Sequence, residues 1–339
     1  MTAQDTAVKT PGGKKNATDR IYGALTQVLS GSAFLFLALI VVVLLVYSYP
    51  SFVYNGFHFF VSTAWNPALD SQIITVNGIK VFQGASYGML VYFVGTLLTS
   101  SLALLIGVPL SLGIAIFLSQ FAPRRVASPV SFVVELLAGI PSVIYGLWGF
   151  IVLGPILLHD VEPQMAKYLG FIPGFQGPTY SYGLLAAGLI LSIMIVPIVA
   201  SISRDAMAQT PRELKEGGKA LGMTDWEITR KIVLPFAKTG IIGAVILGLG
   251  RALGETMAVA MVAQGANLLP HSLYYPTNSI AAFLALNFDG AFTDSTNMFV
   301  YSLGELALVL LAITMLVNIG ARLLVSKGFF SSTEHVIQV

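Results

Sequence analysis

The fold is decided by residues 204–235, which read RDAMAQTPRELKEGGKALGMTDWEITRKIVLP between two long apolar runs. Thr210 followed by Pro211 is typical of a helix start with proline at the first helical position, and Glu213 completes a capping box. Gly222 predicts the end of this helix, because glycine readily adopts the left-handed conformation that follows helix C-termini. A short helix is therefore expected between Thr210 and Gly222.

A second short helix is expected directly after the first. Thr224 is suited to cap it, with Glu227 three residues later, and the helix should run to Leu234 before Pro235. Two such helices joined by a tight turn would form a rigid knob at a membrane surface. Periodicity alone is equally compatible with an ordinary amphipathic connector.

The composition around this segment is that of a membrane protein. Of 339 residues, 55% are hydrophobic and only 10% are charged, whereas about a quarter of the residues in a soluble domain are charged. The chain has no cysteine, which excludes disulfides and cysteine-ligated metals, and its four histidines show no ligand spacing.

Six runs are long and apolar enough to cross a bilayer, which takes about 20 residues of helix. We therefore predict an all-α membrane protein with a polar, disordered tail at 1–24, a transmembrane domain at 25–330 containing a coupling segment at 204–238, and a second tail at 331–339. The six predicted spans are Val28–Tyr49, Tyr87–Leu118, Val130–Leu157, Tyr182–Ile202, Gly240–Val262 and Tyr301–Val325.

The basic residues predict the orientation of these spans. The loops on one side contain only Lys80 and Lys167, so the positive-inside rule places both termini and the loops after spans two and four in the cytoplasm. The basic residues on the predicted cytoplasmic side are Lys9, Lys14, Lys15, Arg20, Arg124, Arg125, Arg204, Arg212, Lys215, Lys219, Arg230, Lys231, Lys238, Arg322 and Lys327.

The polar segment resembles the EAA signature of ABC-importer permeases. Glu216-Gly217-Gly218 is followed after three residues by Gly222, and after nine more by Ile232-Val233-Leu234-Pro235. The resemblance implies that the helix including Glu213 docks in a cleft of an ATP-binding subunit. Both alanines of the signature are glycine here, at a cost of about 1 kcal/mol per helical position, so this helix should depend on its partner for order.

Three longer stretches resemble one family within that class. GTLLTSSLALLIGVPLSLGIAIFLS (residues 95–119), ELLAGIPSVIYGLWGF (135–150) and LGLGRALGETMAV (247–259) are similar to the PstC family of phosphate-transport permeases. This implies a type I ABC-importer fold in a cell membrane, with phosphate as substrate. It also implies a PstA-like second permease, a PstB-like ATPase dimer and a PstS-like phosphate-binding protein as partners.

No nucleotide-binding motif accompanies this resemblance. Gly218-Lys219 is followed by Ala220 and lacks the spacing of a P-loop, so ATP and Mg are expected on the partner ATPase, with no cofactor in this chain. We therefore expect a transport subunit rather than an enzyme, with membrane lipid around it and no nucleic-acid partner.

Arg251 and Glu255 lie four residues apart within the predicted fifth span, on one helix face where they could pair. Charges at this depth normally face a bundle interior or an aqueous path. Arginine suits an oxyanion because its planar guanidinium forms bidentate hydrogen bonds. The alternative is a self-neutralised pair that stabilises a subunit interface.

Two further acidic residues are weaker candidates. Glu135 opens the predicted third span and is assigned to the substrate pathway with Arg251 and Glu255, while Glu305 begins the sixth; each could instead be an interfacial charge. Gly139 and Pro141 should bend the third span. Sulfate or molybdate as substrate, an ion-coupled secondary anion transporter and a membrane scaffold stay open as alternatives.

Overall fold

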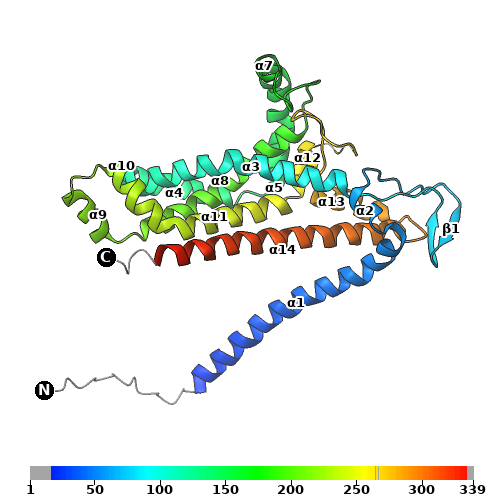
Figure 1. The fold of residues 1–339 in the computed structure, drawn as a ribbon, viewed down its shortest axis with the longest axis horizontal. Helices are drawn as coiled ribbons and strands as arrows, with labels where there is room; N and C mark the ends of the chain where they lie inside the picture. Colours follow the sequence, from blue (N-terminus) through cyan, green and yellow to red (C-terminus); the bar gives the residue numbers. More distant parts are fainter. Residues whose placement is uncertain (1–16, 264, 266, 334–339) are drawn as a thin grey trace. The chain divides into compact units, whose positions relative to one another are not determined.

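A computed structural model describes residues 17–263, 265 and 267–333 and is mostly helical (Figure 1). The α-helices are α1 (Ala17–Asn55), α2 (His58–Val61), α3 (Leu90–Ile116), α4 (Arg124–Ala138), α5 (Ser142–Trp148), α6 (Gly154–Ile156), α7 (Glu162–Leu169), α8 (Leu184–Ala208), α9 (Arg212–Ala220), α10 (Asp225–Ile228), α11 (Leu234–Gly254), α12 (Met257–Ala263), α13 (Ile280–Ala291) and α14 (Met298–Thr333). Four π-helical turns, η1 (Phe117–Phe121), η2 (Gly149–Leu153), η3 (Leu157–Val161) and η4 (Thr229–Val233), join neighbouring helices, and the strands are β1 (Ile73–Val76) and β2 (Ile79–Phe82).

Six helical segments of the described chain are long and apolar enough to cross a membrane, which confirms the predicted number. Helix α1 begins at Ala17, earlier than the domain boundary expected at residue 25. The rest of the predicted N-terminal tail (1–16) and the C-terminal residues 334–339 lie outside the described residues. The six segments are Ile21–Asn55, Leu90–Phe121, Ser142–Leu169, Leu184–Ala208, Asp225–Gly254 and Met298–Gly320.

The chain divides into two compact units, residues 1–46 and residues 47–339. In the first unit, the part of α1 from Ile21 onward has almost all of its side chains exposed, as suits a helix surrounded by lipid. In the second unit, α8 is the most buried span and packs against α3 and α11. Small residues allow this approach: an added Cβ at Gly107 of α3 would meet Ile195 of α8 at 2.8 Å.

The third predicted span was wrong in its placement. Val130–Leu157 is not one helix, because α4 ends at Ala138 and the span begins at Ser142, continuing through η2, α6 and η3 to Leu169. The break lies at Gly139 and Pro141, where the sequence predicted a bend. Pro141 has no N–H to donate, so the helical hydrogen-bond pattern cannot continue through it. The Tyr145 hydroxyl donates to the carbonyl of Leu137 at 2.9 Å and satisfies one acceptor that the break frees.

The fifth span also differs from its prediction of Gly240–Val262. The helical segment starts at Asp225 and passes through Pro235 without ending, because η4 widens the helix just before the proline and accommodates its missing N–H. It ends at Gly254, where Glu255 is extended (φ −69°, ψ 129°), and α12 follows. The Thr256 hydroxyl donates to the Gly254 carbonyl at 3.2 Å, satisfying an acceptor at the break.

A β-hairpin that the sequence analysis did not predict lies between α2 and α3. Strands β1 and β2 are antiparallel and are joined by Asn77-Gly78, both with positive φ (52° and 81°), which is the two-residue turn favoured in hairpins. In residues 47–333, Figure 1 shows this hairpin, α2 and α13 at one end and α9 and α10 at the other.

Candidate functional site: the α9–α10 segment and the mid-membrane charges

Helix α9 begins one residue later than the sequence predicted. Pro211 occupies the N-cap position, and no side chain caps the helix, so the capping box expected from Thr210 and Glu213 does not form. The buried Thr210 hydroxyl has no hydrogen-bond partner among the described residues. The predicted end is confirmed: Gly222 has φ +76°, and its N–H donates to the Lys219 carbonyl at 2.9 Å.

Helix α10 begins as predicted. Thr224 and Glu227 form a complete capping box, with the Glu227 N–H donating to Thr224 Oγ1 at 3.3 Å and the Thr224 N–H donating to Glu227 Oε2 at 3.0 Å. Lys231 Nζ lies 3.3 Å from Glu227 Oε1, one turn further on. Helix α10 is the first turn of the helical segment that forms the fifth span, so α10 is held directly by the membrane domain.

Two sides of α9 have different surroundings. An added Cβ at Gly218 would meet Ile232 at 2.9 Å and Ile228 at 3.1 Å, so this glycine lets α9 pack closely on α10 and η4. Gly217 has open space instead. Of the predicted coupling residues, the structure brings Gly218 and Ile232 together; Leu234 is half-buried, and those left on the exposed surface are Glu213, Glu216, Gly217, Gly222 and Pro235.

The exposed side of the segment carries large apolar side chains. Leu221 is 84% exposed, Trp226 is 54% exposed and Leu214 is 47% exposed. Leu214 and Leu221 are seven residues apart and share one face of α9 with Gly217. An apolar face on an otherwise charged helix outside the spans is typical of an interaction surface.

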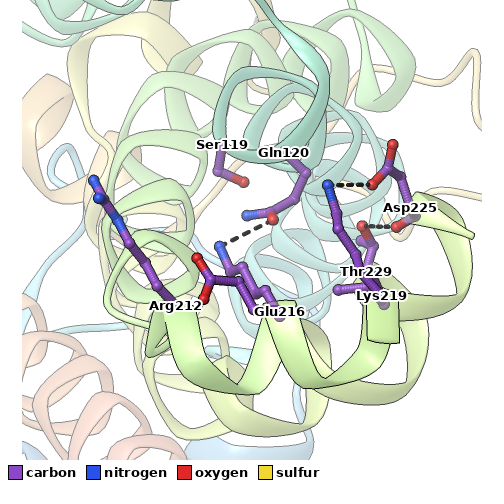
Figure 2. Close-up of a pocket in the computed structure, with 9 residues that line it drawn as sticks. Ser119, Gln120, Arg212, Glu216, Lys219, Asp225 and Thr229 are labelled. Carbon is purple, nitrogen blue, oxygen red and sulfur yellow. Dashed lines mark hydrogen bonds and ion pairs between the residues drawn. The ribbon is translucent and has the colours of Figure 1, made fainter. Parts of the chain in front are cut away.

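The opposite side of α9 borders a cavity of about 310 Å³ (Figure 2). Lys215 Nζ donates to Gln120 Oε1 of η1 at 3.2 Å, and Lys219 Nζ lies 3.3 Å from Asp225 Oδ1 of α10. The cavity thus lies between α9, the end of the second span and the start of the fifth. Its lining residues are Ser119, Gln120, Arg212, Lys215, Glu216, Lys219, Asp225, Ile228 and Thr229.

The predicted pairing of Arg251 and Glu255 is wrong. Because α11 ends at Gly254, the two residues no longer share a helix face, and no ion pair of the described residues joins them. The buried Nε of Arg251 has no hydrogen-bond partner among these residues, and its guanidinium lies within electrostatic range of Tyr145 on α5. Glu255 is buried, and its Oε1 accepts the N–H of Ala258 at 3.3 Å.

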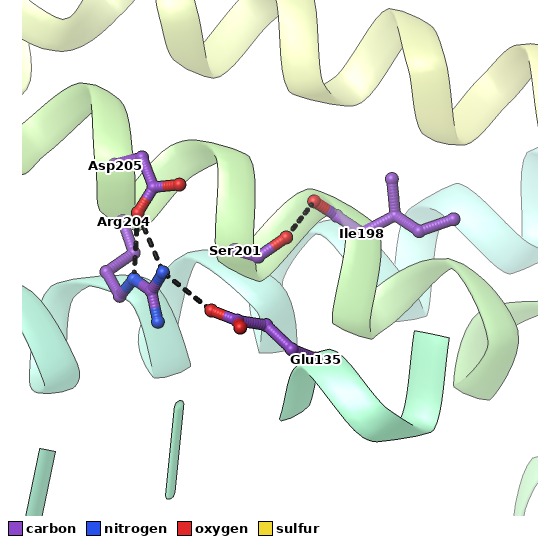
Figure 3. A network of polar contacts seen from close by, with 5 residues as sticks. All are labelled: Glu135, Ile198, Ser201, Arg204 and Asp205. Carbon is purple, nitrogen blue, oxygen red and sulfur yellow. Dashed lines mark hydrogen bonds and ion pairs between the residues drawn. The ribbon is translucent and has the colours of Figure 1, made fainter. Parts of the chain in front are cut away.

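Glu135 lies in an ionic network rather than beside Arg251 (Figure 3). Its Oε1 is 3.0 Å from Arg204 Nη2, which is also 2.8 Å from Asp205 Oδ1. The Arg204 side chain is 18% exposed and that of Glu135 is 53% exposed. The network ties α4 to the end of α8, and Arg204 is a member that sequence reasoning had treated only as a topological charge.

Two buried carboxyl groups lie elsewhere in the spans. Glu162 Oε2 accepts the N–H of Tyr180 at 3.0 Å. Glu305 is fully buried, and the polar side chains of Ser51 and Asn55 lie beside its carboxylate. The hydropathy of the third span gave no signal for Glu162, whereas Glu305 was recognisable as a charge inside a span.

Comparisons with known proteins agree on the class of this chain. The profile of the family described as "Binding-protein-dependent transport system inner membrane component" matches residues 107–327. The "Phosphate transport system permease protein PstC 1" of Mycobacterium tuberculosis is 45% identical over 280 residues, covering 80% of this chain and 82% of the relative. The "Phosphate transport system permease protein PstC" of Pasteurella multocida is 40% identical over 311 residues, covering 91% of each chain.

A solved structure is similar in fold. A chain of the MetNI methionine ABC transporter, in an inward-facing conformation, aligns with a TM-score of 0.50 and 19% identity over 69% of this chain and 92% of that chain. At this identity the likeness concerns the arrangement of helices alone.

Proposed function

The chain belongs to the PstC family of phosphate-transport permeases, inner-membrane components of binding-protein-dependent transport systems, and we propose that it forms half of the path by which an ATP-driven importer moves inorganic phosphate. It is a multi-pass membrane protein with six spans in its described part. The observation that carries the proposal is the α9–α10 segment, in which α9 packs on the start of the fifth span and presents an exposed apolar face.

The segment is suited to receive force from an ATPase. The last turn of α9 packs closely on the start of the fifth span at Gly218, and the turn that follows α9 is fixed by the positive φ of Gly222. Leu214, Leu221 and Trp226 supply an exposed apolar face of the kind that docks in a partner's cleft. We infer that a PstB-like ATPase dimer binds here and that ATP and Mg bind to that dimer.

The complex would contain two further partners. A PstA-like second permease would supply the other half of the path, and a PstS-like protein would deliver phosphate. Basic residues gather in the loops near α9, which by the positive-inside rule places α9 in the cytoplasm and the β-hairpin outside. Because the chain lacks cysteine, Arg230→Cys and Asn77→Cys should label from the inside and the outside respectively; the reverse pattern would contradict this orientation.

Arg251 is the side chain best suited to meet the anion. Its guanidinium carries no paired carboxylate among the described residues and lies next to the break between α11 and α12. An unpaired charge at this depth is costly unless water, a partner or an anion compensates it. We propose that phosphate passes Arg251, that Glu255 shapes the break by holding the start of α12, and that Glu135 acts at the pathway's edge through Arg204.

Uptake by the reconstituted complex tests the proposal. ³²P-phosphate should enter proteoliposomes only with ATP and the binding protein, and excess sulfate or molybdate should leave its uptake unchanged. Uptake driven by an ion gradient without ATP would instead indicate a secondary transporter, and suppression by sulfate or molybdate would indicate another oxyanion as the natural substrate.

A further inference from the structure

The side of α9 that borders the cavity carries three basic residues, of which Lys215 is half-buried and Arg212 and Lys219 are exposed. Arg212, Lys215 and Lys219 are spaced by three and four residues, and all three line the cavity beneath the helix (Figure 2). This face points toward η1 and α10, whereas Leu214 and Leu221 are exposed on the other side. The basic face is therefore separate from the surface that we assign to the ATPase.

The positive charge in the cavity is only partly compensated. Lys219 is paired with Asp225, but Lys215 has only the neutral amide oxygen of Gln120 as its partner, and Arg212 has no carboxylate partner in the described part of the chain. Burial lowers the pKa of the Lys215 ammonium, and the nearby charge of Arg212 lowers it further. A negatively charged group bound between Arg212 and Lys215 would reduce the repulsion between their two positive charges.

Two neutral donors face the same cavity. Gln120 Nε2 is buried and has no hydrogen-bond partner among the described residues. Ser119 Oγ makes a long contact of 3.5 Å to the Ile116 carbonyl and one of 3.5 Å to the weak acceptor Met207 Sδ. Glu216 is the one carboxylate of the lining that no described ion pair engages. With three basic and two acidic side chains, the lining has a net charge of +1.

We propose that this cavity is a binding site for a phosphate-type oxyanion, held by Arg212 and Lys215 with Gln120 Nε2 and Ser119 Oγ as additional donors. Guanidinium and ammonium groups with neutral N–H and O–H donors are the groups that bind such anions in proteins. The anion is either free phosphate or the phosphate of an anionic lipid headgroup, since both present the same oxygens.

An anion in this cavity would bridge α9 to η1. Because η1 continues the second span, occupancy would limit the movement of α9 against the membrane domain. If α9 couples the ATPase to transport, as proposed above, the site would make that coupling sensitive to phosphate or lipid on the same side of the membrane. The binding site itself does not depend on the coupling role.

Phosphate binding to the assembled, nucleotide-free complex tests the site. Complexes in phosphatidylcholine nanodiscs, all carrying Arg251→Gln to remove the proposed transport contact, would be titrated with ³²P-phosphate. Arg212→Gln with Lys215→Gln should weaken binding about tenfold or more, because two charge-assisted contacts are lost. The matched control is Arg230→Gln, which neutralises an exposed basic residue of the same segment outside the cavity lining and should change nothing.

Gln120→Glu separates loss of binding from loss of folding. It places a carboxylate beside Lys215, which should strengthen the contact between α9 and η1 while excluding the anion. Nanodiscs containing phosphatidylglycerol, examined by native mass spectrometry, form the lipid arm: retention that depends on Arg212 and Lys215 would identify the headgroup as the source. The proposal is overturned if neither phosphate nor phosphatidylglycerol binding distinguishes the double variant and Gln120→Glu from Arg230→Gln.

Discussion

Among the described residues, charged side chains form ion pairs in the α9–α10 segment but not at the break after α11. In the segment, several charged side chains find partners a few residues away, as Glu227 does with Thr224 and Lys231. At the break, Arg251 and Glu255 are equally close in sequence and do not pair. Glu255 accepts a backbone N–H, as Glu227 does, but no described ion pair engages it, and Arg251 Nε is left without a described partner.

The difference follows from what each environment demands of the backbone. At the start of α10, Glu227 caps the Thr224 N–H and still pairs with Lys231, because water can satisfy the remaining backbone groups of an exposed helix end. Within a span, every freed N–H and C=O must be satisfied by the protein. The side chains of Glu255 and Thr256 satisfy backbone groups at the break. The guanidinium of Arg251 therefore has no carboxylate partner in the described chain, and we propose that the transported anion compensates its charge.

Removing the charge of Arg251 should have the largest effect. Arg251→Gln is expected to reduce ATP-dependent phosphate uptake about tenfold or more, since a charge-assisted contact is lost. Arg251→Lys should retain part of the uptake because it keeps the charge without the bidentate geometry. Uptake is measured on complexes shown by co-purification to be assembled. Near-normal uptake by Arg251→Gln would remove Arg251 from the path.

A bulky residue at Gly222 should have the next largest effect. Gly222→Val forces a β-branched residue to φ +76°, at a cost of about 1–2 kcal/mol, and should displace the turn between α9 and α10. Uptake should fall strongly while membrane insertion is retained. Since open space surrounds Gly222, the effect would be due to the backbone alone; undiminished uptake would count against a coupling role for the segment.

Neutralising Glu135 should have a modest effect. The Glu135 side chain is half exposed, and Arg204 keeps Asp205 at 2.8 Å, so Glu135→Gln should cost less than about 1 kcal/mol in thermal unfolding of the complex. Uptake should decrease only slightly. A loss as large as that of Arg251→Gln would instead show that Glu135 takes part directly in the path.

The two glycines of the EAA-like motif should give the smallest effects, and in a defined order. Gly217→Ala enters open space and should stabilise α9 by up to about 1 kcal/mol. Gly218→Ala must displace the side chains of Ile232 and Ile228, which should offset that gain. Amide hydrogen exchange of α9 measures both, and greater protection by Gly218→Ala would contradict the packing described here.

The sequence predicted the parts of the fold that local chemistry determines. The number of spans follows from hydropathy, the end of α9 from Gly222, and the start of α10 from Thr224 and Glu227. The family followed from the EAA-like spacing and from ungapped strings within the spans, and the matching relatives confirm it.

Other features depend on contacts that hydropathy does not encode. The break at Gly254 lies inside an apolar run, so the sequence alone suggested a continuous helix and an Arg251–Glu255 pair. The partner of Glu135 is Arg204, 69 residues away, and no local pattern connects them. The hairpin at Asn77-Gly78 has a recognisable turn signal, which the sequence analysis did not use.

The most direct test of the account is phosphate uptake by the complex carrying both Arg251→Gln and Glu255→Gln. Glu255→Gln alone keeps an oxygen that can accept the Ala258 N–H and should assemble normally. Because the two residues do not pair, the double variant should transport as poorly as Arg251→Gln alone. Recovery of near-normal uptake would show that they neutralise one another in the working complex, and that Arg251 does not serve the anion.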